Sequence, residues 1–134
     1  MYLVDTVVIS EARSGSKEAA AWLRSIDPST VYISTITIGE LMRGIAKKRS
    51  IVPRRASDLE IWLKTFCVEQ HDHILPITAA VAMEWGRIAA QRPRGDANGL
   101  IAATAIVHDL ILVTRNVAEF EDTRASTLNP WDLR

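Results

Sequence analysis

The feature that most constrains the fold is an alternation between short, β-branched apolar runs and longer segments with helical periodicity. The runs are MYLVDT at 1–6, VYISTIT at 31–37, ILPI at 74–77 and LILVTRN at 110–116. Between them, apolar residues recur every three or four positions, as on one face of a helix. This alternation predicts an α/β architecture in which helices flank a central, mostly parallel sheet of about four to five strands.

Local signals mark several helix starts within these segments. Ser16 is a plausible N-cap, and Pro53 occupies a favourable position in a first turn. The segment NGLIAATAIVH at 98–108 predicts a further helix, which Asp96 would precede as a cap or a partner of the helix dipole. His71 and His73 are expected to be surface polar groups of a loop.

Length and composition indicate one domain spanning residues 1–134, with 48% hydrophobic and 24% charged residues. Sixteen basic and sixteen acidic residues cancel, so any nucleic acid must be bound through a local patch. The single cysteine, Cys67, fits a reducing compartment. No signal peptide or membrane span is recognisable, and a cytoplasmic location without membrane association is therefore expected.

Polar side chains follow the predicted strands at the places where functional groups of parallel sheets gather. Asp5 and Thr6 end the first run, and Thr114, Arg115 and Asn116 end the last. Two further positions lie in the first turns of helices, Glu40 after the second run and Asn98 before the last. The topology therefore predicts that oxygen-bearing side chains from four distant segments meet at one end of the sheet.

Such a cluster favours a hard divalent cation. Neighbouring carboxylates raise one another's pKa unless a cation neutralises them, and oxygen ligands without His or Cys suit Mg²⁺ or Mn²⁺. A metal of this kind acts on phosphodiesters by binding phosphate oxygens and activating water. A single acid at a strand end is more often a turn former or cap, so the interpretation depends on the four positions converging.

Several motifs resemble those of the PIN-domain toxins of the VapC and FitB type. They are LVDTVVISE at 3–11, STITIGELMRGI at 34–45, NGLIAATA at 98–105, LVTRN at 112–116, EF at 119–120 and NPW at 129–131. They follow the family's order and spacing over nearly the whole chain. The resemblance implies a PIN-like fold and a Mg²⁺- or Mn²⁺-dependent endoribonuclease that is the toxin of a type II toxin–antitoxin system.

The resemblance also implies partners and site residues. The partners are a VapB-type antitoxin, an RNA substrate of the tRNA or rRNA class, a second copy in a homodimer, and operator DNA reached through the antitoxin. The implied catalytic set is Asp5, Glu40, Asn98 and Asn116, of which Asp5, Glu40 and Asn98 are the metal ligands. Thr6, Asp96, Thr114 and Glu119 are the implied supporting residues around them.

Two positions depart from the family pattern. Val7 replaces an Asn that usually follows Asp-Thr, and Asn98 replaces the family's third acid. An amide keeps one metal-binding oxygen but loses the negative charge, so Mg²⁺ affinity should fall. Three hypotheses account for an Asn at position 98. We favour an inactivating substitution. The alternatives are a natural exchange in which Asp96 becomes the metal ligand, and a protein that has lost catalysis. The last account makes the chain a non-catalytic RNA- or antitoxin-binding regulator.

RNA binding also requires cations near the site. Arg43 and Lys47 share a helix face with Glu40, and the basic run continues through Lys48, Arg49, Arg54 and Arg55. We predict that Arg43 and Lys47 bind RNA, although lysines at a helix end also complement the helix dipole. Arg92 and Arg94 are expected at the opposite rim.

Overall fold

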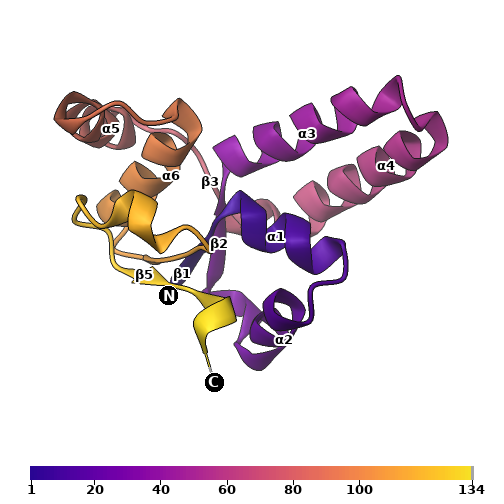
Figure 1. The fold of residues 1–134 in the computed structure, drawn as a ribbon, viewed down its shortest axis with the longest axis horizontal. Helices are drawn as coiled ribbons and strands as arrows, with labels where there is room; N and C mark the ends of the chain where they lie inside the picture. Colours follow the sequence, from indigo (N-terminus) through magenta and orange to yellow (C-terminus); the bar gives the residue numbers. More distant parts are fainter. Residues whose placement is uncertain (134) are drawn as a thin grey trace.

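Five parallel strands form the centre of the computed structural model, which describes residues 1–133 (Figure 1). The strands are β1 (Tyr2–Val4), β2 (Val31–Ser34), β3 (Ile74–Leu75), β4 (Ile111–Val113) and β5 (Thr127–Leu128). Their order across the sheet is β3-β2-β1-β4-β5. The predicted parallel sheet is confirmed. From β1 the chain adds β2 and β3 on one side, and β4 and β5 lie on the other side. The direction of strand addition therefore reverses between the neighbouring strands β1 and β4.

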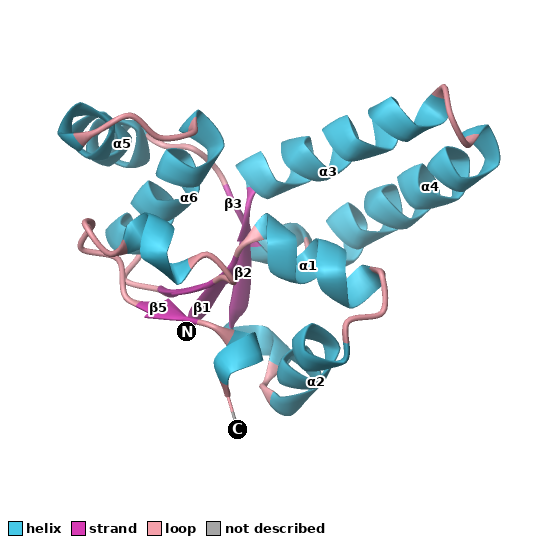
Figure 2. Ribbon diagram, viewed as in Figure 1, coloured by secondary structure: helices cyan, strands magenta, loops and turns pink. Residues whose placement is uncertain are grey.

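Residues 1–133 contain six α-helices. The helices lie around the sheet, as Figure 2 shows. They are α1 (Thr6–Arg13), α2 (Lys17–Ser25), α3 (Thr35–Arg49), α4 (Pro53–Glu69), α5 (Ala79–Gln91) and α6 (Asp96–Val107). In the part of the chain that the structure describes, the connections also contain the short 3₁₀ helices η1 (Pro28–Thr30), η2 (His71–His73), η3 (Val117–Phe120) and η4 (Pro130–Asp132). The predicted roles of Ser16 as an N-cap and Pro53 at a helix start are confirmed.

Alternate residues of the strands point to opposite faces and build two cores. Leu3 and Leu112 belong to a buried cluster with residues of α5 and α6. Val4 and Val113, one position later, belong to a second cluster with residues of α1 and α2. Helices therefore cover both faces, as predicted.

The helices α3 and α4 form a long antiparallel hairpin that extends away from the sheet (Figure 2). A third cluster centred on Ile45, Ala56 and Leu63 joins them. Helix α1 lies beside this hairpin and contacts α3 (Figure 1). Within residues 1–133, no helix combines the length and apolarity that crossing a membrane requires.

His73 departs from the predicted surface loop. It belongs to η2, its Nδ1 lies 2.8 Å from the carbonyl oxygen of Val31, and its ring stacks on Tyr32. These contacts fasten the segment before β3 to β2. His71 is exposed, as predicted.

Candidate metal-dependent active site

Asp5 lies at the point where the strand order reverses. It follows β1 directly and is the N-cap of α1, so the turn from strand to helix fixes its position. Its Oδ1 accepts a hydrogen bond from the Thr6 backbone N–H at 2.8 Å, and its Oδ2 accepts one from the Thr114 hydroxyl at 2.7 Å. In open α/β sheets, ligands bind outside the carboxyl ends of the strands at such a reversal.

The Asp5 side chain carries an unfavourable charge when it is ionised. Only 5% of the residue is exposed, and this burial raises the pKa of its carboxyl group. The hydrogen bonds from Thr114 and Thr6 lower the pKa and offset part of the shift, whereas the nearby charge of Glu40 raises it further. A cation at this position would offset both the cost of burying the Asp5 charge and its repulsion with Glu40.

Glu40 lies beside Asp5 because α3 follows β2 at the same end of the sheet. Its Oε1 accepts a hydrogen bond from the Thr6 hydroxyl at 2.6 Å. The same hydroxyl oxygen lies 3.0 Å from the hydroxyl oxygen of Thr37, which is fully buried one turn before Glu40. Thr6 therefore links both acids, Asp5 through its backbone and Glu40 through its side chain.

Asn98 and Asn116 lie on a neighbouring polar pocket. Asn98 is the third residue of α6, and Asn116 immediately precedes η3. The polar residues lining the pocket are Asn98, Arg115, Asn116, Glu119, Asn129 and Asp132. The backbone N–H of Asn116 donates to the Thr114 hydroxyl at 3.1 Å, and Thr114 in turn donates to Asp5. This chain of bonds connects the pocket to the buried acid.

The donor set suits a lightly charged magnesium site. Among residues 1–133, no three His, Cys, Asp or Glu side chains are grouped as metal ligands. Asp5 and Glu40 would supply two carboxylates to such an ion, and Asn98, which lines the adjoining pocket, would supply an amide oxygen. Magnesium is commonly bound by one or two carboxylates with water completing the shell. The residues thus fit such an ion, with less negative charge than three acids would provide.

Comparison with known proteins decides the family. The family model described as PIN domain matches residues 2–125. The chain belongs to the PIN-domain family. It is 33% identical to toxin FitB of Neisseria gonorrhoeae and 30% identical to VapC ribonuclease Y4jK of Sinorhizobium fredii, each alignment covering 98% of this chain and 99% of the relative.

Solved structures agree with this assignment. The crystal structure of FitAcB from N. gonorrhoeae matches with a TM-score of 0.90 and 32% identity, over 99% of this chain and 100% of that one. A toxin–antitoxin complex from Klebsiella pneumoniae matches with a TM-score of 0.74 and 26% identity, over 99% and 100% of the two chains. The resemblance drawn from the motifs is therefore confirmed at the level of family and fold.

The two predicted supporting acids of this PIN domain, Asp96 and Glu119, differ in their relation to the polar pocket. Asp96 is the first residue of α6 and Gly95 is the N-cap, so the prediction that Asp96 precedes the helix is wrong by one position. Asp96 is exposed in the first turn, where its charge favours the helix dipole, and it does not line the pocket of Asn98. Glu119 does line that pocket, and its Oε2 lies 3.6 Å from Arg92.

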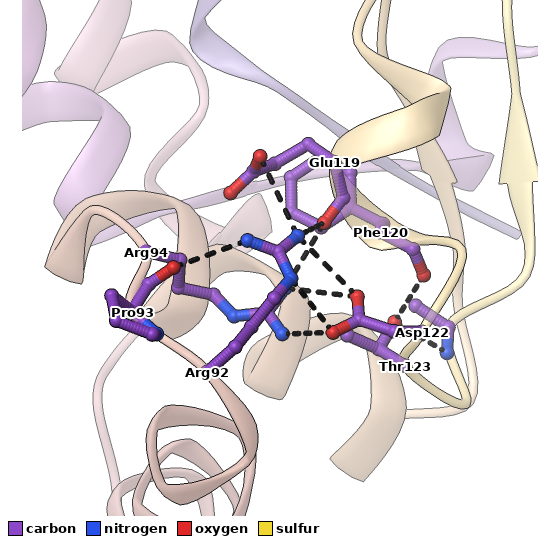
Figure 3. A network of polar contacts seen from close by, with 8 residues as sticks. Arg92, Pro93, Arg94, Glu119, Phe120, Asp122 and Thr123 are labelled. Carbon is purple, nitrogen blue, oxygen red and sulfur yellow. Dashed lines mark hydrogen bonds and ion pairs between the residues drawn. The ribbon is translucent and has the colours of Figure 1, made fainter.

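Arg92 and Arg94 form an internal network in place of the predicted RNA-binding rim (Figure 3). Arg94 pairs with Asp122 at 2.6 Å, and both arginines donate to the backbone carbonyl of Glu119. The Arg94 side chain is only 1% exposed, so it cannot meet a ligand at the surface. The hydrogen bond from Arg94 is the main cause that lowers the pKa of Asp122 to about 2.

The Arg92–Arg94–Asp122 network holds the start of α6 against η3. On another side of α6, Gly99 allows close packing against α5, because a Cβ at that position would lie 3.0 Å from Cδ1 of Trp85. The segments bearing Asn98 and Asn116 are consequently fastened together by contacts outside the polar pocket. The predicted position at the rim is wrong for Arg94, because sequence proximity to Asp96 does not reveal burial, and it stays a prediction for Arg92.

The predicted cations Arg43 and Lys47 are both exposed on α3. Nη2 of Arg43 lies 3.9 Å from Oε2 of Glu40, which places this cation beside the candidate site as expected. Thr37 was missed by the sequence analysis. Its position one helical turn before Glu40 was the available signal, because residues three apart share a helix face.

Proposed function

We propose that this PIN domain is the toxin of a type II toxin–antitoxin pair and is built as a divalent-metal-dependent endoribonuclease. The observation that supports it most is the junction of Asp5 and Glu40 through Thr6 at the strand-order reversal. The names of its relatives, toxin FitB and VapC ribonuclease, support the same function.

In this proposal, Asp5, Glu40 and the amide oxygen of Asn98 hold Mg²⁺ or Mn²⁺. The bound ion would supply Lewis acidity toward a phosphate oxygen and lower the pKa of an attacking water. Thr114 and the Thr6 backbone orient the Asp5 carboxylate, while the Thr6 hydroxyl orients Glu40. Asn116 and Glu119 line the adjoining pocket, where they would contact RNA or solvent around the ion.

Asn98 determines how active this chain is. A carboxylate at this position would add a third negative charge, so the amide should weaken metal binding and cleavage. The polar pocket does not contain Asp96, which favours impaired activity over a natural exchange of ligands. The alternative function is a regulator of the same fold that binds RNA or an antitoxin without cutting.

The proposed partners follow from proteins of similar structure. The FitAB complex bound to an IR36 DNA fragment matches with a TM-score of 0.77 and 31% identity. We therefore include a VapB-type antitoxin that covers the toxin's active-site groove, a homodimer of the toxin, and operator DNA bound through the antitoxin. The proposed substrate is an RNA of the tRNA or rRNA class.

The test compares this chain with Asn98→Asp, each purified without antitoxin and incubated with total bacterial RNA in Mg²⁺, Mn²⁺ or chelator. We expect strong cleavage by Asn98→Asp only with metal, and weak or no cleavage by this chain. The double variant Asp5→Asn/Asn98→Asp is the matched control and should not cut. Equal cleavage by this chain and Asn98→Asp would exclude position 98 as a ligand, and absence of cleavage by both would favour the binding-only regulator.

A further inference from the structure

A groove leads away from Glu40, lined by residues of α1 and of the α3–α4 hairpin. Figure 1 shows α1 beside this hairpin. The volume of the groove is about 240 Å³, and its inner end is formed by Thr6 and Glu40, the residues that share a hydrogen bond in the candidate site. Any polymer with a reacting group at the acids can therefore continue into this groove.

Three cations from three different helices line the groove. Arg13 comes from the last turn of α1, Lys48 from the last turn of α3, and Arg55 from the first turn of α4. All three are exposed, and within residues 1–133 none has a carboxylate within 4.0 Å. Among the described lining residues Glu40 is the one acid, so the groove is positive along its length and negative only at the inner end.

These cations differ from two other arginines, which are engaged within the protein. Arg49 pairs with Glu60 at 3.1 Å, and Arg94 is buried against Asp122. The position of Arg55 is electrostatically unfavourable within the protein. A cation in the first turn of a helix opposes the helix dipole, and this turn contains no acid. An external anion would stabilise Arg55 where the protein itself does not.

The floor of the groove also restrains one of the cations. The guanidinium carbon of Arg13 lies 5.4 Å from the centroid of the Trp62 ring, within the range of a cation–π contact. Trp62 is half-buried against α3 and α4, so it is held by the hairpin. Arg13 is thereby held at the wall of the groove without being neutralised.

We infer that this groove is a subsite for the RNA strand next to the cleaved bond, in which Arg13, Lys48 and Arg55 bind successive backbone phosphates. The inference rests on the proposed function, since the paired acids define where the cleaved phosphodiester lies. It assigns the main phosphate contacts to these three residues, alongside the contacts predicted for Arg43 and Lys47. RNA is the occupant because the cationic groove opens directly from a site suited to phosphodiester chemistry.

The experiment measures binding of a fluorescent 12-nucleotide oligouridylate to the full chain in chelator, where a metal nuclease does not cut. The groove variant is Arg13→Gln/Lys48→Gln/Arg55→Gln. The matched control is Lys17→Gln/Arg24→Gln/Arg87→Gln, which removes the same number of charges and the same residue types from elsewhere. Far-UV circular dichroism and thermal melting establish that both variants fold.

We expect the groove variant to bind at least tenfold more weakly at low salt and the control to stay within about twofold of the unmodified chain. Binding to single strands loses about 0.7 in the slope of log K against log salt for each phosphate contact removed, so three contacts predict a slope smaller by about 2. Unchanged affinity and slope in the groove variant would overturn the inference. Equal losses in both variants would also overturn it, because they would indicate diffuse attraction.

A second probe separates RNA from an acidic protein segment. If the groove variant loses binding of a poly-glutamate of matched charge but keeps its affinity for the oligouridylate, the groove cations serve a protein segment alone and the inference is wrong. Failure of Asn98→Asp to cleave RNA would instead count against the proposed nuclease while leaving these binding results intact. The two failures are therefore distinguishable.

Discussion

The hydroxyl group of Thr114 donates a 2.7 Å hydrogen bond to Asp5 across 109 positions of sequence. Each residue directly follows a central strand, and the two strands are neighbours in parallel register, Val4 opposite Val113. The bond is therefore a direct product of the sheet topology. It fixes one oxygen of a buried carboxylate at the point where the strand order reverses.

Thr114→Val should destabilise the protein by about 2 kcal/mol, because a buried charged acceptor loses its donor. Thr114→Ser keeps the hydroxyl and should cost much less. Urea unfolding of both variants at neutral pH in chelator measures the difference. Equal destabilisation by Val, which lacks the hydroxyl, and Ser, which lacks only the methyl group, would contradict a dominant contribution from the hydrogen bond.

Asp5→Asn should raise the melting temperature of the metal-free protein at neutral pH. Burial raises the folded-state pKa of Asp5, so the unmodified protein loses stability as pH increases from about 3.8 through that folded-state pKa. The Asn variant has no such loss. Its advantage should be near zero below pH 3.8 and complete at pH 7.5 in thermal melts. An advantage that does not change with pH would contradict a raised pKa at this residue.

The fold and the central acids were predictable because they depend on short-range pattern and on general topology. Strand runs ending in Asp5 and Thr114 place those residues together whenever the strands are parallel neighbours. The contact of Thr37 with Thr6 was harder to predict from the sequence, since it depends on the rotation of α3 against α1.

Two other features depend entirely on tertiary packing. Arg92 and Arg94 reach Asp122 across about thirty positions that show no shared periodicity. The groove cations likewise converge from three helices whose relative placement the sequence does not specify. In both cases the sequence identified charged residues but not whether each one pairs inside the protein or faces solvent.

Asn98→Asp should lower the stability of the metal-free protein and make stability depend on magnesium. In the proposed site, a third carboxylate beside Asp5 and Glu40 would add repulsion, which a bound cation would remove. At a Mg²⁺ concentration a hundredfold above Kd, binding should contribute about 2.7 kcal/mol. Thermal melts of both chains over a Mg²⁺ titration test this. Identical curves for the two chains would count against a shared acidic site.

Arg94→Met should cost about 2 kcal/mol, because the side chain is 1% exposed and makes charge-assisted hydrogen bonds to Asp122 and to the Glu119 carbonyl. Arg92→Met is the matched control and should cost less, since Arg92 is 38% exposed. Chemical unfolding of the two variants gives the comparison. A larger loss from Arg92→Met would mean that the exposed arginine is the main support of the network.

The stability that Asp122 provides should disappear in acid, in the opposite sense to the effect of Asp5. Arg94 and Arg92 lower the folded-state pKa of Asp122 to about 2, so its contribution is complete above about pH 3.8 and is lost as pH falls toward 2. The melting-temperature difference between the unmodified chain and Asp122→Asn should therefore be largest near pH 6 and shrink through this window. Taking the difference between these two chains cancels the titration of Asp5, which both retain. A difference that persists undiminished at pH 2 would show that the network does not depend on the Asp122 charge.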